Sequence, residues 1–332
     1  MRLKEAILAT LLPAVLLTAS CAVEPTTGTY TSQDRVMQAW MRHNHPGVST
    51  YGNTSLYVID MDEGHGPAAG DSSYVCVHYT KRSLTGDILS TNHQALAEQL
   101  GNYSVSTYYG SRIWRVDQGY LPTDLETVIK RMRSGGRVTV ALPVSASLHD
   151  NSMYSAFTGT SENDNELIDL TIDTVLADIH AYQEQVMKEW FSRNYQVADT
   201  AAEHLYFKKL EEHTADTDTI PEGNNVSIRY IGRLLNGQVF DTNIEDTAKF
   251  YRIWKKGGSY DAMNLTYHND EALFNENSSV IKGFGKAIQK MNFGEKAVTV
   301  FSSRLGYGEA GESPSIPEYA PLCFWLYIEP KN

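Results

Sequence analysis

Two patterns of apolar positions recur along this chain. Apolar residues at helical spacing occur in residues 36–41 and again in 186–191, which predicts two amphipathic helices. Their stripes comprise Val36, Met37, Trp40 and Met41 in the first, and Val186, Met187, Trp190 and Phe191 in the second. Strict alternation at Val226, Ile228 and Tyr230 predicts a half-buried strand. We interpret the stripes as packing faces.

Turn and stop signals place further elements in the second half. Asn236-Gly237 between apolar runs predicts a tight hairpin. A short amphipathic helix is expected over about 284–291, with Gly294 beyond its end. The runs "KAVTVFSS" and "PLCFWLYIE" predict two more strands.

Four blocks recur in the same order about 150 residues apart, which indicates a tandem duplication. The pairs are "VMQAWMRHNH" with "VMKEWFSRNY", "SLYVIDMDEG" with "HLYFKKLEEH", "YVCVHYTKRSLTGDILSTN" with "NVSIRYIGRLLNGQVFDTN", and "ETVIKRMRSGGRVTVAL" with "GKAIQKMNFGEKAVTVF". We expect one domain over 30–178 and another over 179–332. Each would be α+β, an antiparallel sheet with a short helix on one face and a further helix before it.

The first 21 residues have the layout of a secretory signal peptide. Arg2 and Lys4 precede an apolar run, and small residues precede Cys21. This arrangement is similar to a bacterial lipoprotein signal, in which Cys21 becomes the lipidated first residue. The sequence therefore predicts an exported protein, lipid-anchored in the bacterial cell envelope and facing the periplasm or the surface. An ordinary cleaved signal with an incidental cysteine remains the alternative.

Net charge and cysteine content bear on the possible ligands and on disulfide formation. A net charge of −12 argues against nucleic acid, since phosphate binding needs clustered lysine and arginine. Cys76 and Cys323 lie in apolar runs; an exported protein could join them in a disulfide, but buried thiols fit the pattern better. No feature of the sequence indicates an oligomeric state.

Two short motifs suggest nucleotide binding or metal binding, but the residues around them do not fit those functions. Gly306, Gly308 and Gly311 have dinucleotide-fingerprint spacing, but two prolines follow and prevent a helix start. "HNHPG" at 43–47 suggests a metal fragment without a carboxylate cluster, and the chain has no G-x-S-x-G elbow for a hydrolase. The glycines therefore predict a loop between two strands.

The second unit resembles the FKBP-type peptidyl-prolyl cis-trans isomerases. The resemblance is carried by "SIRYIGRLLNGQVFDTN", "SVIKGFGKAIQKMNFGEKAVTV", "LGYGEAG" and "SIPEYAPLCFWLYIE", which occur in family order between residues 205 and 329. It implies that the "GYG" loop closes over a substrate proline, that clients are proline-containing polypeptides, and that no cofactor or metal is needed.

The resemblance also implies a set of pocket residues. The catalytic group would be Tyr230, Phe240, Asp241, Tyr307 and Phe324, and the substrate-binding group Val280, Ile281, Phe284 and Ile316. Phe284 takes a floor position usually held by tryptophan. Residues 244–277 form a longer segment than the family pattern, in which Met263 stands in for a usual phenylalanine.

In the first unit the pocket positions have changed. Leu89 and Ser90 replace Phe-Asp, and Ile168 replaces Phe324. Pro122 removes a backbone N–H that would orient substrate, and no "GYG" loop is present. We therefore expect an active second unit and an inactive first one. The alternatives are a non-catalytic, chaperone-like or assembly lipoprotein that binds polypeptide, and a structural envelope component.

Overall fold

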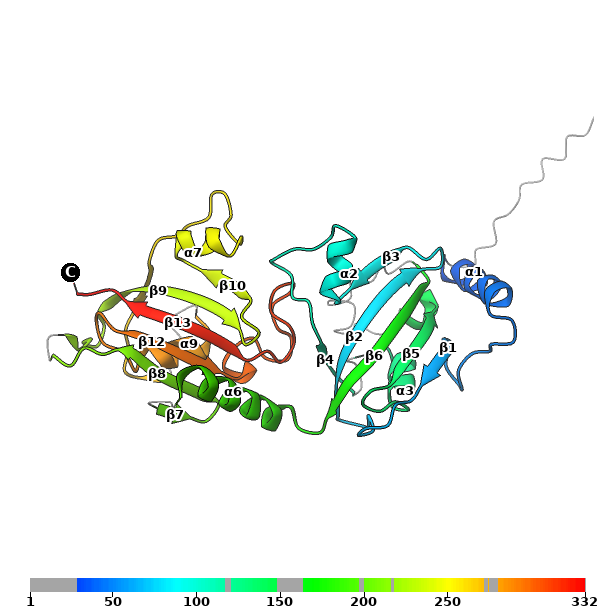
Figure 1. Cartoon of the computed structure of the whole chain (residues 1–332), viewed down its shortest axis with the longest axis horizontal. Coiled ribbons are helices and arrows are strands. Elements are labelled where there is room, and N and C mark those ends of the chain that lie inside the picture. The colour runs from blue at the N-terminus through cyan, green and yellow to red at the C-terminus, as the bar shows by residue number, and fades with distance from the viewer. Residues whose placement is uncertain are drawn as a thin grey trace, which may run out of the picture.

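The computed structural model describes residues 29–116, 121–147, 164–196, 200–215, 218–271, 274 and 280–331. These residues form two antiparallel sheets in successive halves of the chain, each with helices packed on it (Figure 1). The predicted signal segment and Cys21 lie outside the described residues. Within the described ranges, no helix is both long enough and apolar enough to cross a membrane.

The first sheet has the strand order β1-β5-β6-β2-β3, and β4 pairs with β2. Its strands are β1 (Tyr57–Asp62), β2 (Tyr74–Ser83), β3 (Ile88–Thr91), β4 (Arg112–Arg115), β5 (Arg137–Leu142) and β6 (Glu166–Leu176). The helices among the described residues of this half are α1 (Thr29–Asn44), α2 (Gln94–Gln99), α3 (Thr123–Ile129) and α4 (Val144–Ser147).

The second sheet repeats that order as β8-β12-β13-β9-β10, with β11 on β9 and an extra edge strand, β7. Its strands are β7 (Thr200–Ala202), β8 (Leu205–Glu211), β9 (Asn225–Leu234), β10 (Val239–Thr242), β11 (Met263–Thr266), β12 (Lys296–Phe301) and β13 (Leu322–Ile328). The helices are α6 (Ile179–Tyr195), α7 (Glu245–Phe250), α9 (Lys282–Ile288) and a 3-10 turn, η2 (Ser303–Leu305).

Equivalent residues make equivalent hydrogen bonds in the two halves. Asn92 accepts from the Tyr79 N–H at 2.7 Å and donates to the Val77 carbonyl. Asn243 does the same with the Tyr230 N–H, at 2.9 Å, and with Ile228. Each asparagine thus satisfies the backbone where the central strand meets the hairpin. The two α+β domains share their detailed construction as well as their strand order.

The helix that precedes each sheet covers the face opposite the short internal helix. Buried Met37 and Met41 of α1 pack on one face of the first sheet, and Met187 and Phe191 of α6 pack on Val298 and Val300. The sequence analysis placed a helix on only one face of each sheet. It was incomplete because it did not say which surface the apolar stripes of the two preceding helices cover. Val36 was wrongly included: its side chain is 52% exposed.

Several local predictions are confirmed. The hairpin turn at 236–237 has Gly237 at φ +93°, a left-handed conformation that glycine adopts without strain. The predicted internal helix is α9, beginning two residues earlier than expected. Cys76 and Cys323 are buried free thiols. Past Gly311 the chain makes an antiparallel bridge between Glu312 and Ile316, with no helix.

The two domains exchange tyrosines. Tyr319, from the loop before β13, is buried in the core of the first domain and meets the Tyr74 ring edge-to-face at 5.2 Å. Tyr108, from the loop before β4, packs against the core of the second domain. Each hydrophobic core is therefore completed by a residue from the other domain.

Replacing Asp178 by alanine should lower the thermal midpoint at pH 7. Asp178 is the N-cap of α6 and accepts hydrogen bonds from the His180 and Ala181 N–H groups, which lower the pKa of its carboxyl. A lowered carboxyl pKa gives stability that is present above the unfolded pKa, about 4, and is lost as the pH falls through the folded value. The two proteins should therefore converge in melting experiments at acid pH. A pH-independent difference would contradict this account.

Candidate functional site

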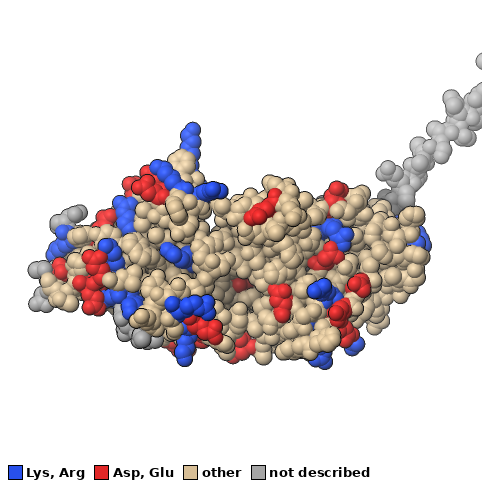
Figure 2. Space-filling model, in the orientation of Figure 1, with Lys and Arg blue, Asp and Glu red and all other residues tan. Residues whose placement is uncertain are grey.

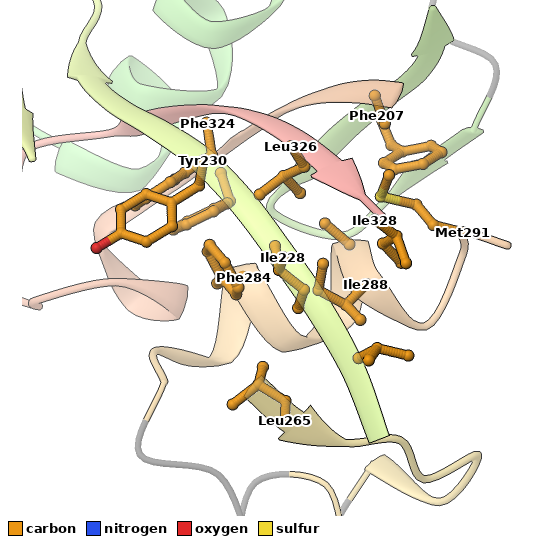
Figure 3. Close-up of a cluster of buried hydrophobic side chains, with 14 of the residues drawn as sticks. Phe207, Ile228, Tyr230, Leu265, Phe284, Ile288, Met291, Phe324, Leu326 and Ile328 are labelled. Atoms are coloured by element: carbon orange, nitrogen blue, oxygen red, sulfur yellow. The ribbon is translucent and has the colours of Figure 1, made fainter. Parts of the chain in front are cut away.

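Aromatic rings gather in the second domain between α9 and the strands β9 and β13. The rings of Phe324 and Phe284 meet edge-to-face at 5.3 Å, and those of Tyr230 and Phe284 at 5.7 Å. Phe240 meets Phe324 edge-to-face at 5.7 Å. In Figure 3, Tyr230, Phe284 and Phe324 lie together, and the Tyr230 hydroxyl points away from the core. Four side chains predicted from sequence thus form one cluster.

Strand alternation and one glycine create room for this cluster. Phe324 lies opposite Gly232 in the pairing of β13 with β9. A Cβ at Gly232 would stand 2.7 Å from the Phe240 ring and 2.9 Å from the Phe324 ring. Both rings can cover the strand only because this position carries no side chain.

The structure gives Asp241 a partner that the sequence did not. The Tyr230 hydroxyl donates a 2.7 Å hydrogen bond to the Asp241 carboxylate. Burial, followed by the hydrogen bond to Asp241, raises the pKa of the Tyr230 hydroxyl. That hydroxyl therefore remains a donor at neutral pH, and it holds the exposed carboxylate at the edge of the aromatic cluster.

The remaining predicted residues surround the same cluster. Ile316 is buried within it, and Val280 and Ile281 pack against it half-buried. Ile281 is the N-cap of α9, and its N–H donates to no described residue. Tyr307 is 36% exposed, and burial and the charges of Glu312 and Asp241 raise the pKa of its hydroxyl. Ile281 and Tyr307 thus supply two hydrogen-bond donors.

A cavity of about 370 Å³ opens beside the cluster, and Phe240 and Asp241 are the predicted site residues that line it. Its other walls come from Thr242, from α7 and the segment after it, from residues 312–315 of the late loop, and from Ser106 of the first domain. Tyr230, Phe284 and Phe324 do not line this cavity and are largely buried. We call it the proline cavity below, after Pro314 in its wall.

Sequence reasoning missed one neighbour of the aromatic cluster. Phe301 stacks on Phe324 at 5.7 Å, and its ring would stand 2.3 Å from a Cβ at Gly283. The alternation in β12 places Phe301 on the same face as Ala297 and could have identified it. Met263 packs against the cluster, at the position where the family pattern has phenylalanine.

No group of three histidine, cysteine, aspartate or glutamate side chains that could hold a metal ion occurs within the described ranges. The predicted site residues are aromatic and aliphatic side chains, one carboxylate and two donors, and the charged Lys255 and Glu312 also line the cavity. Such a set can bind and orient a peptide, and it contains no evident nucleophile held by a base.

The equivalent position in the first domain is filled. Lys81 takes the place of Gly232, and its ammonium lies 2.7 Å from the Glu166 carboxylate, with side-chain exposures of 0% and 3%. Burial lowers the pKa of Lys81 and raises that of Glu166. Ile168 is buried where Phe324 stands, and Pro122 is the N-cap of α3. The described residues of this domain form no equivalent ring cluster, and Pro122 has no backbone N–H at the position of Ile281.

The fold and site together define a protein of two FKBP-like domains, of which the second retains the aromatic cluster. A model of the FKBP-type peptidyl-prolyl cis-trans isomerases matches residues 217–328. FK506-binding protein 1 of Yarrowia lipolytica is 31% identical over 110 residues, which are 33% of this chain and 82% of that protein. The chain belongs to the FKBP-type peptidyl-prolyl cis-trans isomerase family.

Two further similarities extend over more of the chain. A probable FKBP-type peptidyl-prolyl cis-trans isomerase of Haemophilus influenzae is 29% identical over 145 residues, 43% of this chain and 49% of that protein. The match thus spans about half of the relative's length. The crystal structure of the three FKBP domains of wheat FKBP73 is 16% identical with a TM-score of 0.30, covering 83% of this chain and 94% of that one.

Proposed function

We propose that the second domain is a peptidyl-prolyl cis-trans isomerase acting on exported polypeptides. The observation that carries the proposal is the Phe240–Asp241 pair at the mouth of the proline cavity, backed by the rings of Phe324 and Phe284. The first domain, with Lys81 filling the equivalent place, would have no such activity.

Prolyl isomerisation requires no reactive side chain. It is accelerated by an environment less polar than water. The X-Pro bond prefers trans by only about 0.5–1 kcal/mol, but partial double-bond character gives a barrier of about 18–20 kcal/mol. Twisting the bond breaks amide resonance and withdraws charge from the carbonyl oxygen. An aromatic wall therefore favours the twisted amide over the planar one, and this differential binding accelerates the step.

Named groups have roles in this scheme. The ring of Phe240 would contact the proline, with the Phe324 ring packed behind it, and the Ile281 N–H would orient the peptide backbone. The Tyr307 hydroxyl, whose raised pKa keeps it protonated, would donate to a substrate carbonyl. Asp241, held by Tyr230, would set the electrostatic potential at the cavity mouth.

An isomerisation assay on Xaa-Pro peptides tests the proposal, using the chain from residue 29 onward. We expect catalysis above the uncatalysed rate, and a Phe240→Ala variant should lose about tenfold or more of kcat/KM because the wall beside the proline is removed. Tyr327→Ala is the matched control, a half-buried aromatic on the outer face of β13. A folded protein without catalysis on any Xaa-Pro peptide would leave a polypeptide-binding protein as the better account.

We also propose that the protein is exported and anchored by a lipid on Cys21, on the sequence argument for residues 1–21. Proline-containing polypeptides outside the cytoplasm would then be the clients. Membrane fractionation of cells that express the wild type and Cys21→Ala tests this. The wild type should sediment with membranes and the variant should not.

A further inference from the structure

A loop of the first domain reaches the proline cavity of the second. The chain between α2 and β4 runs toward the loop that precedes β13 (Figure 1). The Tyr108 N–H donates to the Pro314 carbonyl at 2.8 Å. Gln238, at the β9–β10 turn, donates to the carbonyls of Val105 and Thr107 at 3.3 and 3.2 Å. Residues 105–108 are thereby joined to two different loops of the second domain.

A buried ion pair fixes this arrangement. Arg112 donates to both carboxylate oxygens of Glu318, at 2.8 and 3.1 Å, and the side chains are 7% and 0% exposed. Two parallel hydrogen bonds between a guanidinium and a carboxylate fix the relative orientation of the two groups and also attract them electrostatically. The loop therefore has a set position relative to the proline cavity, and a client would meet a preorganised surface.

Residues 105–107 line two cavities. Ser106 belongs to the wall of the proline cavity, together with Phe240 and Asp241. Val105 and Thr107 line a second cavity of about 270 Å³, to which Val239 also contributes. Val239 and Phe240 are consecutive in β10, and each lines one of the two cavities. The second cavity, called the tyrosine cavity here, is thus adjacent to the proline cavity.

The lining of the tyrosine cavity selects an uncharged ligand. Tyr103, Tyr109 and Tyr251 line it with amide, hydroxyl and aliphatic side chains, and none of its described lining residues is charged. Tyr103 and Tyr251 are 41% and 37% exposed, and the rings of Tyr103 and Tyr109 stack at 5.4 Å. Tyrosines beside amides suit an aromatic side chain and a peptide backbone. A charged group would lose water without gaining an ionic partner.

We propose that the tyrosine cavity is a subsite for the client, formed jointly by the two domains. It would take an uncharged aromatic side chain a few residues from the proline, in an extended polypeptide that passes over Ser106. This inference rests on the proposed function of the proline cavity. The first domain then contributes to client selection although its own pocket is filled.

Peptides with one Ala-Pro bond test the subsite. Phenylalanine is placed at successive positions before or after the proline, with alanine, glutamate and lysine at the same positions for comparison. Binding is followed by fluorescence anisotropy and turnover by exchange NMR, with the chain from residue 29 onward. At the best position phenylalanine should bind about tenfold more tightly than alanine, the gain of a packed aromatic pair. Glutamate and lysine should show no gain.

Variants decide whether the tyrosine cavity causes that gain. Tyr103→Ala should reduce the phenylalanine advantage to within about twofold and raise KM for long peptides, while turnover of a short Ala-Pro peptide stays unchanged. Tyr327→Ala should retain the advantage. If the short peptide is turned over but phenylalanine gives no gain, or the gain survives Tyr103→Ala, the subsite is refuted alone. If no peptide is turned over, the isomerase proposal fails, and the anisotropy data still decide the subsite.

Discussion

Replacing Lys81 by alanine is expected to lower the free energy of unfolding by about 3–5 kcal/mol. The Lys81 and Glu166 side chains are almost completely buried and lie 2.7 Å apart. Removal of the ammonium leaves a carboxylate in an apolar interior with neither water nor a counter-ion. Urea unfolding followed by circular dichroism measures the loss.

A double variant separates the ion pair from the shape of the core. Lys81→Met together with Glu166→Leu keeps roughly the buried volume and removes both charges, so its stability should match the wild type or exceed it by about 1–4 kcal/mol. If the single variant lost less than about 1 kcal/mol, the pair would not be a buried charge pair in solution. Equal losses in single and double variants would point to packing instead.

Gly232→Ala should lower kcat/KM of the isomerase by about 10–100-fold while the protein stays folded. The added methyl group would stand 2.7–2.9 Å from the Phe240 and Phe324 rings, so both rings must move. Overpacking of this kind costs about 1–3 kcal/mol of stability, less than the total expected for a domain of this size. Steady-state kinetics and a melting curve of the same sample give both numbers.

Gly70→Ala is the control for this substitution. A Cβ at Gly70 meets no atom within 4 Å, and its φ lies outside the left-handed region. Activity and melting temperature should therefore stay near the wild-type values. Unchanged kinetics in Gly232→Ala would show that catalysis does not depend on the position of these two rings.

Local pattern predicted most of the second domain. Alternation in β9, the Asn236-Gly237 turn and the runs that became β12 and β13 each depend on neighbours in sequence, and the structure contains all of them. The helix stripes were recognised, but a stripe does not reveal which surface it covers. For that reason the position of α1 and α6 on the outer sheet faces became clear only from the packing of residues such as Met187 on Val298.

Contacts between the domains could not be predicted from sequence. Arg112 and Glu318 are separated by 206 residues, and each alone reads as an ordinary surface charge. Tyr108 and Tyr319 lie in loops without periodicity. The sequence also did not reveal that Lys81 fills the equivalent position in the first domain. Its strand showed only that the pocket residues of the second domain are replaced in the first. In Figure 2, basic and acidic residues are interspersed on the visible face.

The exchange of tyrosines should make the two domains mutually dependent for folding. Losing the first domain would expose Tyr319 to water and leave the buried Glu318 without Arg112. Unfolding of either half therefore removes part of the other's core, so that the chain should behave as a single cooperative unit. Such coupling gives a physical reason for the first domain to be retained although it lacks the aromatic cluster. Natural selection on the stability of the second domain would also act on the first.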